Sequence, residues 1–296
     1  MPSHYDIVFL GHVCVDEIVH YGGPRTRAIG SAVLCGAMAA ARVGRRVAVV
    51  TRMAVCDEPE LAPLRQAGVN VHVIPAPVTT VMEVIHPSPD VDDRRMTQKA
   101  NAGRFQAAEL PRLDASWLHL AGVTDQEFSL DLVRALRAAG TPLSADLQSF
   151  VRQVTPGSGE IHFRGVPAKR ELVALLDRVK LDVVEAEILT GHRDIETAAR
   201  AVESWGCPEV VVTQAEGVLA RAGGVTHYQR FTNRNSSGRT GRGDTTFAAY
   251  LSWRQGHEPA ESLRFAAALV SLKMEKPGPF TGTLAEVLQR LAGDPS

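Results

Sequence analysis

The chain contains the stretch Ser236-Ser237-Gly238-Arg239-Thr240-Gly241-Arg242-Gly243-Asp244-Thr245-Thr246-Phe247-Ala248-Ala249-Tyr250, in which two glycines bracket one arginine directly before an acid and an apolar run. The apolar run predicts a helix from Asp244 to Arg254. The amides of Gly241-Arg242-Gly243 would lie at its N-terminus, where unpaired N–H groups and the helix dipole bind anions. A carboxylate repels a bound anion, so Asp244 indicates catalysis beside an anion site. The structural alternative is a glycine turn with Asp244 as the N-cap.

Outside this stretch, the composition is that of an enzyme-sized globular chain. It has 296 residues, 45% hydrophobic content, a net charge of -1 and a pI of about 6.8. The near-neutral charge argues against a nucleic-acid or anionic membrane partner. No apolar stretch approaches the roughly 20 residues that a membrane span requires. Four scattered cysteines indicate reduced thiols, and we expect a cytoplasmic location.

Strand-like and helical stretches alternate along the chain, which predicts an α/β fold with a parallel sheet covered by helices on both faces. The predicted strands are Ile7 to Leu10, Arg46 to Val50, Trp117 to Leu120, Leu143 to Asp146, Leu181 to Val184 and Val210 to Val212. The predicted helices are Gly36 to Val43, Leu130 to Ala139, Lys169 to Leu176 and Ile195 to Ser204. Ligands of such sheets collect at the carboxyl ends of the strands.

One region departs from this alternation. Residues Val71 to Thr97 are rich in strand-forming residues and poor in helical pattern. With Asp16 to Ile29 they could form a small sheet beside the main one. The alternative is an extra hairpin at the edge of the core.

The glycine stretch resembles the C-terminal signature of the ribokinase-like (PfkB) carbohydrate kinases. Gly241, Gly243 and Asp244 match its Gly-x-Gly-Asp run, with Arg242 where the family usually has Ala. Three further segments match in the family's order: Gly11 to Asp16, Gly30 to Gly44, and Asp182 to Glu185 at the place of Asn-x-x-Glu.

The resemblance implies a single domain over residues 1–296, built as a three-layer sandwich with a mostly parallel central sheet. It also implies a small β-sheet lid from about 16–29 and 71–104. Such a lid covers the acceptor and is a candidate homodimer contact. The implied cofactors are ATP and Mg²⁺.

For the acceptor, the resemblance points to Asp16, whose carboxylate can accept several hydrogen bonds from vicinal hydroxyls. The family commonly has Gly-Gly and then an Asn here, whereas this chain has Gly30-Ser31 and then Cys35. A thiol is a weak hydrogen-bonding group, which favours a polyol other than ribose. His12 either lines this pocket or is a structural histidine.

For the donor, Asp182 and Glu185 could hold Mg²⁺ through water, or form a capping box, and the two roles are compatible. Asp182 adds negative charge relative to the family's Asn, and Lys180 is a neighbour that could compensate. The resemblance places the remaining nucleotide contacts at Thr213, Gly217, Thr240, Ala268 and Gly278. The loop from Thr213 to Gly217 is one residue shorter than the family pattern.

These features predict an ATP-dependent kinase that phosphorylates a hydroxyl of a small polyol: a sugar, a sugar acid or a cyclitol. Asp244 would be the general base, and the Gly241-Arg242-Gly243 amides would stabilise the transferring phosphoryl group. Basic residues of the lid region, which would suit an anionic acceptor, are Arg94, Arg95, Lys99 and Arg104. The alternatives are a nucleoside kinase and a non-catalytic regulatory homologue.

Overall fold

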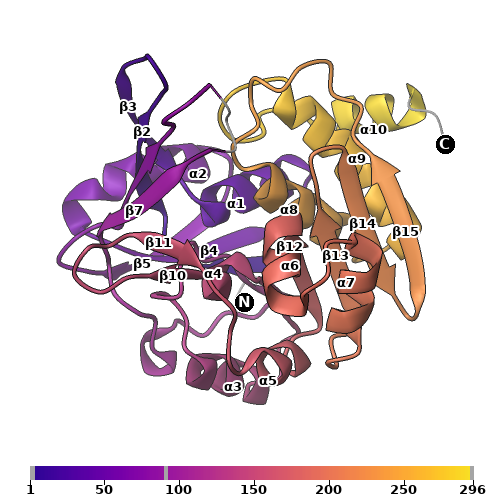
Figure 1. The fold of residues 1–296 in the computed structure, drawn as a ribbon, viewed down its shortest axis with the longest axis horizontal. Helices are drawn as coiled ribbons and strands as arrows, with labels where there is room; N and C mark the ends of the chain where they lie inside the picture. Colours follow the sequence, from indigo (N-terminus) through magenta and orange to yellow (C-terminus); the bar gives the residue numbers. More distant parts are fainter. Residues whose placement is uncertain (1–3, 90–92, 294–296) are drawn as a thin grey trace.

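A computed structural model describes residues 4–89 and 93–293, and its elements alternate as predicted (Figure 1). The main-sheet strands are β1 (Ile7–Leu10), β4 (Val47–Met53), β5 (Asn70–Pro75), β8 (Leu118–Leu120), β9 (Leu143–Asp146), β12 (Arg178–Asp182), β13 (Glu209–Thr213), β14 (Gly217–Ala222) and β15 (Val225–Arg230). A second, smaller sheet, for which we keep the name lid, consists of β2 (Cys14–Val19), β3 (Arg25–Gly30), β6 (Val81–Ile85) and β7 (Arg95–Ala100). A separate hairpin consists of β10 (Arg152–Val154) and β11 (Ile161–Phe163).

The helices connect these strands. The α-helices are α1 (Ala32–Arg42), α2 (Ala62–Gln66), α3 (Leu130–Ala138), α4 (Gln148–Val151), α5 (Lys169–Ala174), α6 (Val183–Thr190), α7 (Ile195–Glu203), α8 (Arg242–Trp253), α9 (Pro259–Met274) and α10 (Leu284–Gly293). The 3-10 helices are η1 (Val55–Leu61) and η2 (Ala107–Glu109).

Within the described residues, the main sheet has the order β15-β14-β13-β12-β9-β8-β1-β4-β5. All pairs from β13 to β5 are parallel, while β14 is antiparallel to both of its neighbours. The carboxyl ends of the parallel strands therefore meet at one edge, as the α/β prediction requires.

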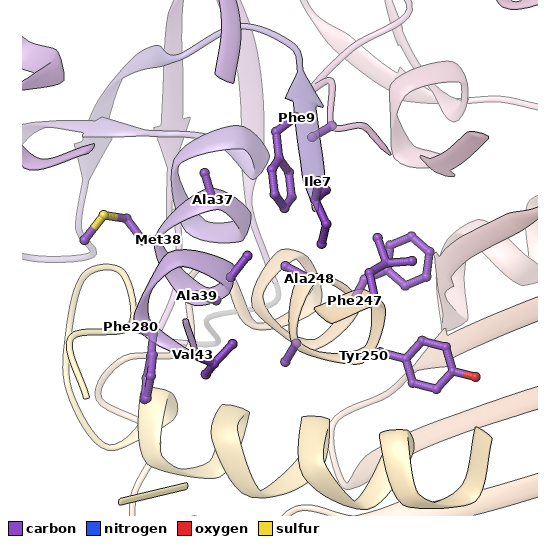
Figure 2. Close-up of a cluster of buried hydrophobic side chains, with 14 of the residues drawn as sticks. Ile7, Phe9, Ala37, Met38, Ala39, Val43, Phe247, Ala248, Tyr250 and Phe280 are labelled. Atoms are coloured by element: carbon purple, nitrogen blue, oxygen red, sulfur yellow. The ribbon is translucent and has the colours of Figure 1, made fainter. Parts of the chain in front are cut away.

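Two hydrophobic cores lie on opposite faces of this sheet. In β1, Ile7 and Phe9 point into one core, and Val8 and Leu10 point into the other. This alternation is the period-two pattern of a strand that is buried on both faces. The first core packs against α1, α2, α8, α9 and α10, and the second packs against α3, α5, α6 and α7. Figure 2 shows side chains of β1, α1 and α8 gathered in the first core.

The lid is a separate four-stranded sheet within the described residues, with the order β3-β2-β6-β7. Its membership corrects one expectation. The segment from Val71 to Ile74 was expected in the lid, but it belongs to β5, which pairs in parallel with β4 at the edge of the main sheet. The described lid strands therefore span residues 14–30 and 81–100, and the hairpin alternative does not hold for β6 and β7.

One strand boundary was also overestimated. The predicted strand from Leu181 to Val184 ends at Asp182, because Asp182 caps α6. No helix in the described ranges, 4–89 and 93–293, is both long and apolar enough to cross a membrane.

Candidate active site

The N-terminus of α8 is the centre of the candidate site. Gly241 is the N-cap and has a φ of 78°, in the left-handed region that favours glycine. The helix begins at Arg242, two residues before the predicted start, so Asp244 is the third helical residue and not the N-cap. Of the two glycines, only Gly241 has a positive φ, whereas Gly243 has helical geometry. The first-turn amides and Asp244 therefore share one end of a helix.

Asp16 extends toward this end of α8 from the middle of β2. Its carboxylate lies over Gly30 on the neighbouring strand β3, and a β-carbon at Gly30 would overlap Asp16 Oδ2. Burial, together with the negative charge of Asp244, raises the pKa of Asp16 to about 7. The electrostatic effect of Asp244 shows that the structure brings these two carboxylates near one another, although 228 positions separate them in the sequence.

Ser31 and Cys35 lie next to these acids. Ser31 is the N-cap of α1 and has a φ of 127° and a ψ of 165°, a region that only glycine adopts without strain. Cys35 Sγ would lie 2.5 Å from a β-carbon at Gly241, so this thiol packs against the α8 turn. Burial, followed by Asp244, raises the pKa of Cys35 to about 12, so the thiol stays neutral. Gly30, Ser31 and Cys35 are thus brought together with Asp16 as predicted.

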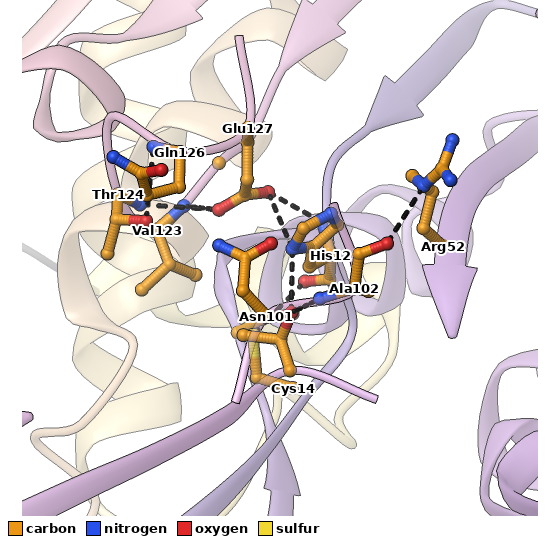
Figure 3. Close-up of polar contacts among 12 residues, drawn as sticks. His12, Cys14, Arg52, Asn101, Ala102, Val123, Thr124, Gln126 and Glu127 are labelled. Atoms are coloured by element: carbon orange, nitrogen blue, oxygen red, sulfur yellow. Dashed lines mark hydrogen bonds and ion pairs between the residues drawn. The ribbon is translucent and has the colours of Figure 1, made fainter. Parts of the chain in front are cut away.

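His12 has a different environment. It is fully buried, and its Nδ1 and Nε2 lie within hydrogen-bonding distance of Thr80 Oγ1 (2.8 Å) and the Gly103 carbonyl (2.9 Å) (Figure 3). Its backbone N–H donates to Glu127 Oε2 at 2.7 Å. Burial lowers the pKa of His12 despite the nearby carboxylate of Glu127. The structure thus supports the structural alternative for His12, because both ring nitrogens already have partners in the fold.

Asp182 and Glu185 form the capping box that the sequence allowed. Asp182 Oδ1 accepts from the Glu185 N–H, and Glu185 Oε2 accepts from the Asp182 N–H, both at 2.8 Å. The buried Glu185 also lies 3.6 Å from Lys180 Nζ and 3.5 Å from Arg152 Nη2.

This arrangement tests the fit of Mg²⁺. Both oxygens of Glu185 are occupied by protein groups, two of them cationic, so Glu185 does not fit direct coordination of a metal ion. Among the described residues, no three or more His, Cys, Asp or Glu side chains are grouped in a way that could hold one. Glu185 is thus not a direct metal ligand, and the role of Asp182 and Glu185 in holding Mg²⁺ through water stays a prediction.

Lys273 was not anticipated from the sequence. Its ammonium donates to the carbonyls of Gly238 and Thr240 and so supports the loop that leads into α8, which we call the donor loop (residues 231–241). Burial lowers the pKa of Lys273, although Cys35 and Asp244 favour its charged form. A signal was present in the sequence, because Lys273 falls on the buried face of an alanine-rich helix, where an unpaired lysine is rare.

The predicted nucleotide contacts divide into two groups. Thr213 ends β13 opposite Asp182, and Thr240 is exposed in the donor loop, so both lie near the start of α8. Gly217 faces the backbone of β15, where a β-carbon would overlap the Gln229 carbonyl, and Ala268 is buried in the first core. Gly217 and Ala268 thus have structural reasons for their identity.

A cavity of about 110 Å³ adjoins the donor loop. It is lined by Leu272, Lys273, Glu275, Lys276, Pro279, Phe280, Thr281, Gly282 and Glu286, and Gly278 lies in the same turn. Pockets for drug-sized ligands and cofactors usually measure about 300–1,000 Å³. This cavity is therefore small for a nucleoside.

Two of the basic residues considered for an anionic acceptor are engaged elsewhere. Lys99 Nζ lies 2.9 Å from Glu83 Oε1 on the neighbouring lid strand, and Arg104 donates to the Asp125 carbonyl at 3.1 Å. Arg95 is exposed at the start of β7. The lid therefore gives little support for a sugar acid as the acceptor.

Comparison with known proteins identifies the family. The model of the pfkB family carbohydrate kinases matches residues 13–285. The chain belongs to this family. A solved structure of a pyrophosphate-dependent kinase in the ribokinase family, in complex with sulfate, is 32% identical, with a TM-score of 0.89 over 96% of this chain and 99% of that one. A second structure, a pyrophosphate-dependent kinase of the ribokinase family complexed with a pyrophosphate analogue and myo-inositol, is 31% identical, with a TM-score of 0.87 over 96% and 99%.

Two other similarities are more distant. A cytidine kinase from Thermococcus kodakarensis is 25% identical over 264 residues, which are 86% of this chain and 91% of that protein. Ribokinase from Arabidopsis thaliana, complexed with ribose and ATP, is 19% identical with a TM-score of 0.77 over 98% and 99%, a likeness of fold. The ribokinase-like fold and the predicted class of enzyme, a carbohydrate kinase that transfers phosphate to a hydroxyl group, are thereby confirmed.

Proposed function

We propose that this kinase phosphorylates a hydroxyl of a cyclitol such as myo-inositol and uses pyrophosphate as the donor. The observation that carries the donor assignment is the surroundings of the donor loop. Lys273 is buried against this loop, Lys180 is buried against the first turn of α8 that follows it, Arg242 begins α8, and the adjoining cavity of about 110 Å³ is small for a nucleoside. Buried cations beside a small cavity suit an inorganic polyphosphate. The 32% identity to a pyrophosphate-dependent kinase supports the same donor.

In the proposed reaction, Asp244 accepts the proton of the acceptor hydroxyl as the hydroxyl oxygen attacks the terminal phosphorus of pyrophosphate. The new P–O bond forms while the bond to the bridging oxygen breaks, and inorganic phosphate leaves. The first-turn amides of α8 stabilise charge on the transferring group without reorganising. Any divalent cation would enter bound to the pyrophosphate oxygens, as part of the donor.

Asp16 would hold the acceptor. Its carboxylate, opposite Asp244, can accept hydrogen bonds from two adjacent ring hydroxyls and so orient a third toward Asp244. The neutral Cys35 thiol replaces a stronger hydrogen-bonding group at the same pocket. A ring with hydroxyls on every carbon tolerates this loss better than a furanose, because neighbouring hydroxyls remain available.

A nucleoside acceptor is the second candidate, since the cytidine kinase is 25% identical. Nucleobases are usually bound by stacking on aromatic rings. None of the four lid strands contains Phe, Tyr or Trp, which argues against this acceptor. Retention of Asp244 and of the left-handed Gly241 turn argues against a non-catalytic homologue. Dimerisation through the lid and a cytoplasmic location stay predictions.

The test is a matrix of two donors, pyrophosphate and ATP, against four acceptors: myo-inositol, ribose, fructose and cytidine. Phosphorus NMR would report the phosphate ester formed in each mixture. We expect the fastest reaction with pyrophosphate and myo-inositol. Product from ATP alone would overturn the donor assignment, and product from cytidine alone would overturn the acceptor assignment.

A further inference from the structure

A buried ion cluster lies beneath the first turn of α8, at the carboxyl ends of β9 and β12. Lys180 Nζ lies 3.1 Å from Asp146 Oδ2 and 3.6 Å from Glu185 Oε2, and the lysine side chain is only 3% exposed. The Asp146 and Glu185 side chains are buried as well. The ammonium is therefore held in one place by two carboxylates from different elements.

This ammonium lies against the anion-binding turn. A β-carbon at Gly243 would be 3.0 Å from both Cε and Nζ of Lys180. Gly243 has helical geometry, so its lack of a side chain is explained by the space that Lys180 occupies and not by its backbone conformation. The lysine thus reaches the same turn whose amides face the donor.

A charge at this position is costly for the fold, because burying an ion costs several kcal/mol before its partners compensate. Burial disfavours the ammonium, but Asp146 and Glu185 outweigh it and raise the pKa of Lys180. Lys180 is therefore charged at neutral pH. Arg152 also lies 3.5 Å from Glu185, so the negative charge of Glu185 is shared between two cations and neutralises Lys180 only in part.

We propose that Lys180 is the fixed cation of the donor site, and that its ammonium binds an oxygen of the donor's terminal phosphoryl group from beneath the first turn of α8. The inference rests on the proposed function and deepens it by naming a donor-binding residue. Lysine binds phosphate as a point charge and needs no bidentate geometry. In this arrangement Asp146 and Glu185 are positioning residues, because they act only through Lys180.

The difficulty in testing this role is that Lys180→Met alone removes the cation paired with the buried Asp146 and leaves it, among the described residues, only the Gln148 N–H as a hydrogen-bond donor, which destabilises the fold. The decisive variant is therefore the double replacement Lys180→Met with Asp146→Asn, which removes the ion pair as a unit. The matched control is Asp146→Asn alone, which keeps the lysine and an oxygen to hold it. Thermal unfolding would confirm that both variants are folded.

Isothermal titration with pyrophosphate and with ATP, in the absence of acceptor, would give the donor affinity of each protein. We expect the double variant to bind the donor about 10–100-fold more weakly than the wild type, the usual value of a charge-assisted contact. We expect Asp146→Asn to bind it equally or more tightly. Wild-type affinity in the double variant, or an equal loss in both variants, would overturn the role of Lys180.

The same titrations separate this inference from the proposed donor. If the wild type bound ATP and not pyrophosphate, the donor assignment would fail, and the comparison of variants with ATP would still decide the role of Lys180. If the wild type bound neither compound, both proposals would be overturned.

Discussion

At the residue scale, the pKa of Asp16 links pH to acceptor binding. Because burial and Asp244 raise this pKa to about 7, Asp16 is largely protonated below that pH and ionised above it. The ionised form accepts more hydrogen bonds, so we expect the acceptor KM to fall as the pH rises through about 7. Steady-state kinetics over a range of pH would measure this dependence. Asp16→Asn should raise KM and abolish the dependence, and an unchanged profile would contradict the placement.

Ser31 offers a test of backbone strain beside the site. Its backbone conformation, with φ 127° and ψ 165°, costs a non-glycine residue about 1–3 kcal/mol. Ser31→Gly should raise the free energy of unfolding by about 0.5–1 kcal/mol, because relief of the strain outweighs two smaller costs. These costs are a few tenths of a kcal/mol for the weaker cap and the greater chain entropy of glycine in the unfolded state. Ser31→Ala is the control and should lower stability, because it loses the cap and keeps the strain. Denaturant unfolding would measure both, and a less stable glycine variant would refute the strain.

Residue types with a fixed chemical meaning were predictable, and contacts between distant residues were not. The local spacing of Gly241 and Asp244 predicted the glycine turn at the start of α8, and this turn is present. Lys180 was recognised as a neighbour of Asp182, but its contacts with Asp146 and Gly243 join separate elements, as do the contacts of Lys273 with the donor loop, so the sequence alone gave no distances for them. His12 is close to Asp16 in the sequence, but both of its ring nitrogens have hydrogen-bond partners in the fold, at Thr80 and Gly103, which the sequence did not reveal.

At the element scale, the two glycines at the start of α8 should respond differently to the same substitution. Gly241→Ala should destabilise the protein by about 1–2 kcal/mol, because its φ of 78° is left-handed and Cys35 Sγ blocks a β-carbon. Gly243→Ala should change the stability little. Alanine stabilises the helix relative to glycine, and this gain offsets the cost of moving the Lys180 side chain away from the new β-carbon.

For donor affinity we expect the opposite order, with Gly243→Ala having the larger effect of the two substitutions. Gly243→Ala displaces the Lys180 ammonium and should weaken donor binding about tenfold or more while the protein stays folded. Thermal unfolding and calorimetric titration of the two variants would make the comparison. Full donor affinity in Gly243→Ala would show that Lys180 does not act at this turn.

Element types were predicted better than element partners. The strand at Val71 to Ile74 was recognised, but its assignment to the lid was wrong, because the sequence of a short apolar strand does not indicate which sheet it joins. β5 pairs with β4 through backbone hydrogen bonds that any strand sequence can form. The start of α8 was placed two residues late because Gly243 is a poor helix former and so hides the first turn of the helix in the sequence.

At the scale of the whole molecule, the lid should be the less protected part. The main sheet is buried between two cores, whereas β3 and β7 of the lid are largely exposed or half-buried. We expect amide hydrogens of the lid to exchange faster than those of β1 and β4. Hydrogen exchange with mass spectrometry would show this difference.

Acceptor binding should then protect the lid selectively, because Asp16 on β2 links the acceptor to the lid sheet. The same experiment with Asp16→Asn is the control and should show a smaller increase at equal acceptor concentration. Protection that rises in the main sheet and not in the lid would place the acceptor elsewhere.

The central claim is that Asp244, at the start of α8, is the general base of phosphoryl transfer. The most direct test is the turnover number of Asp244→Asn with the best donor and acceptor pair. Asparagine has nearly the same shape, so we expect an intact fold and unchanged donor affinity, while kcat falls by about two to four orders of magnitude. A folded Asp244→Asn variant with wild-type kcat would contradict the account.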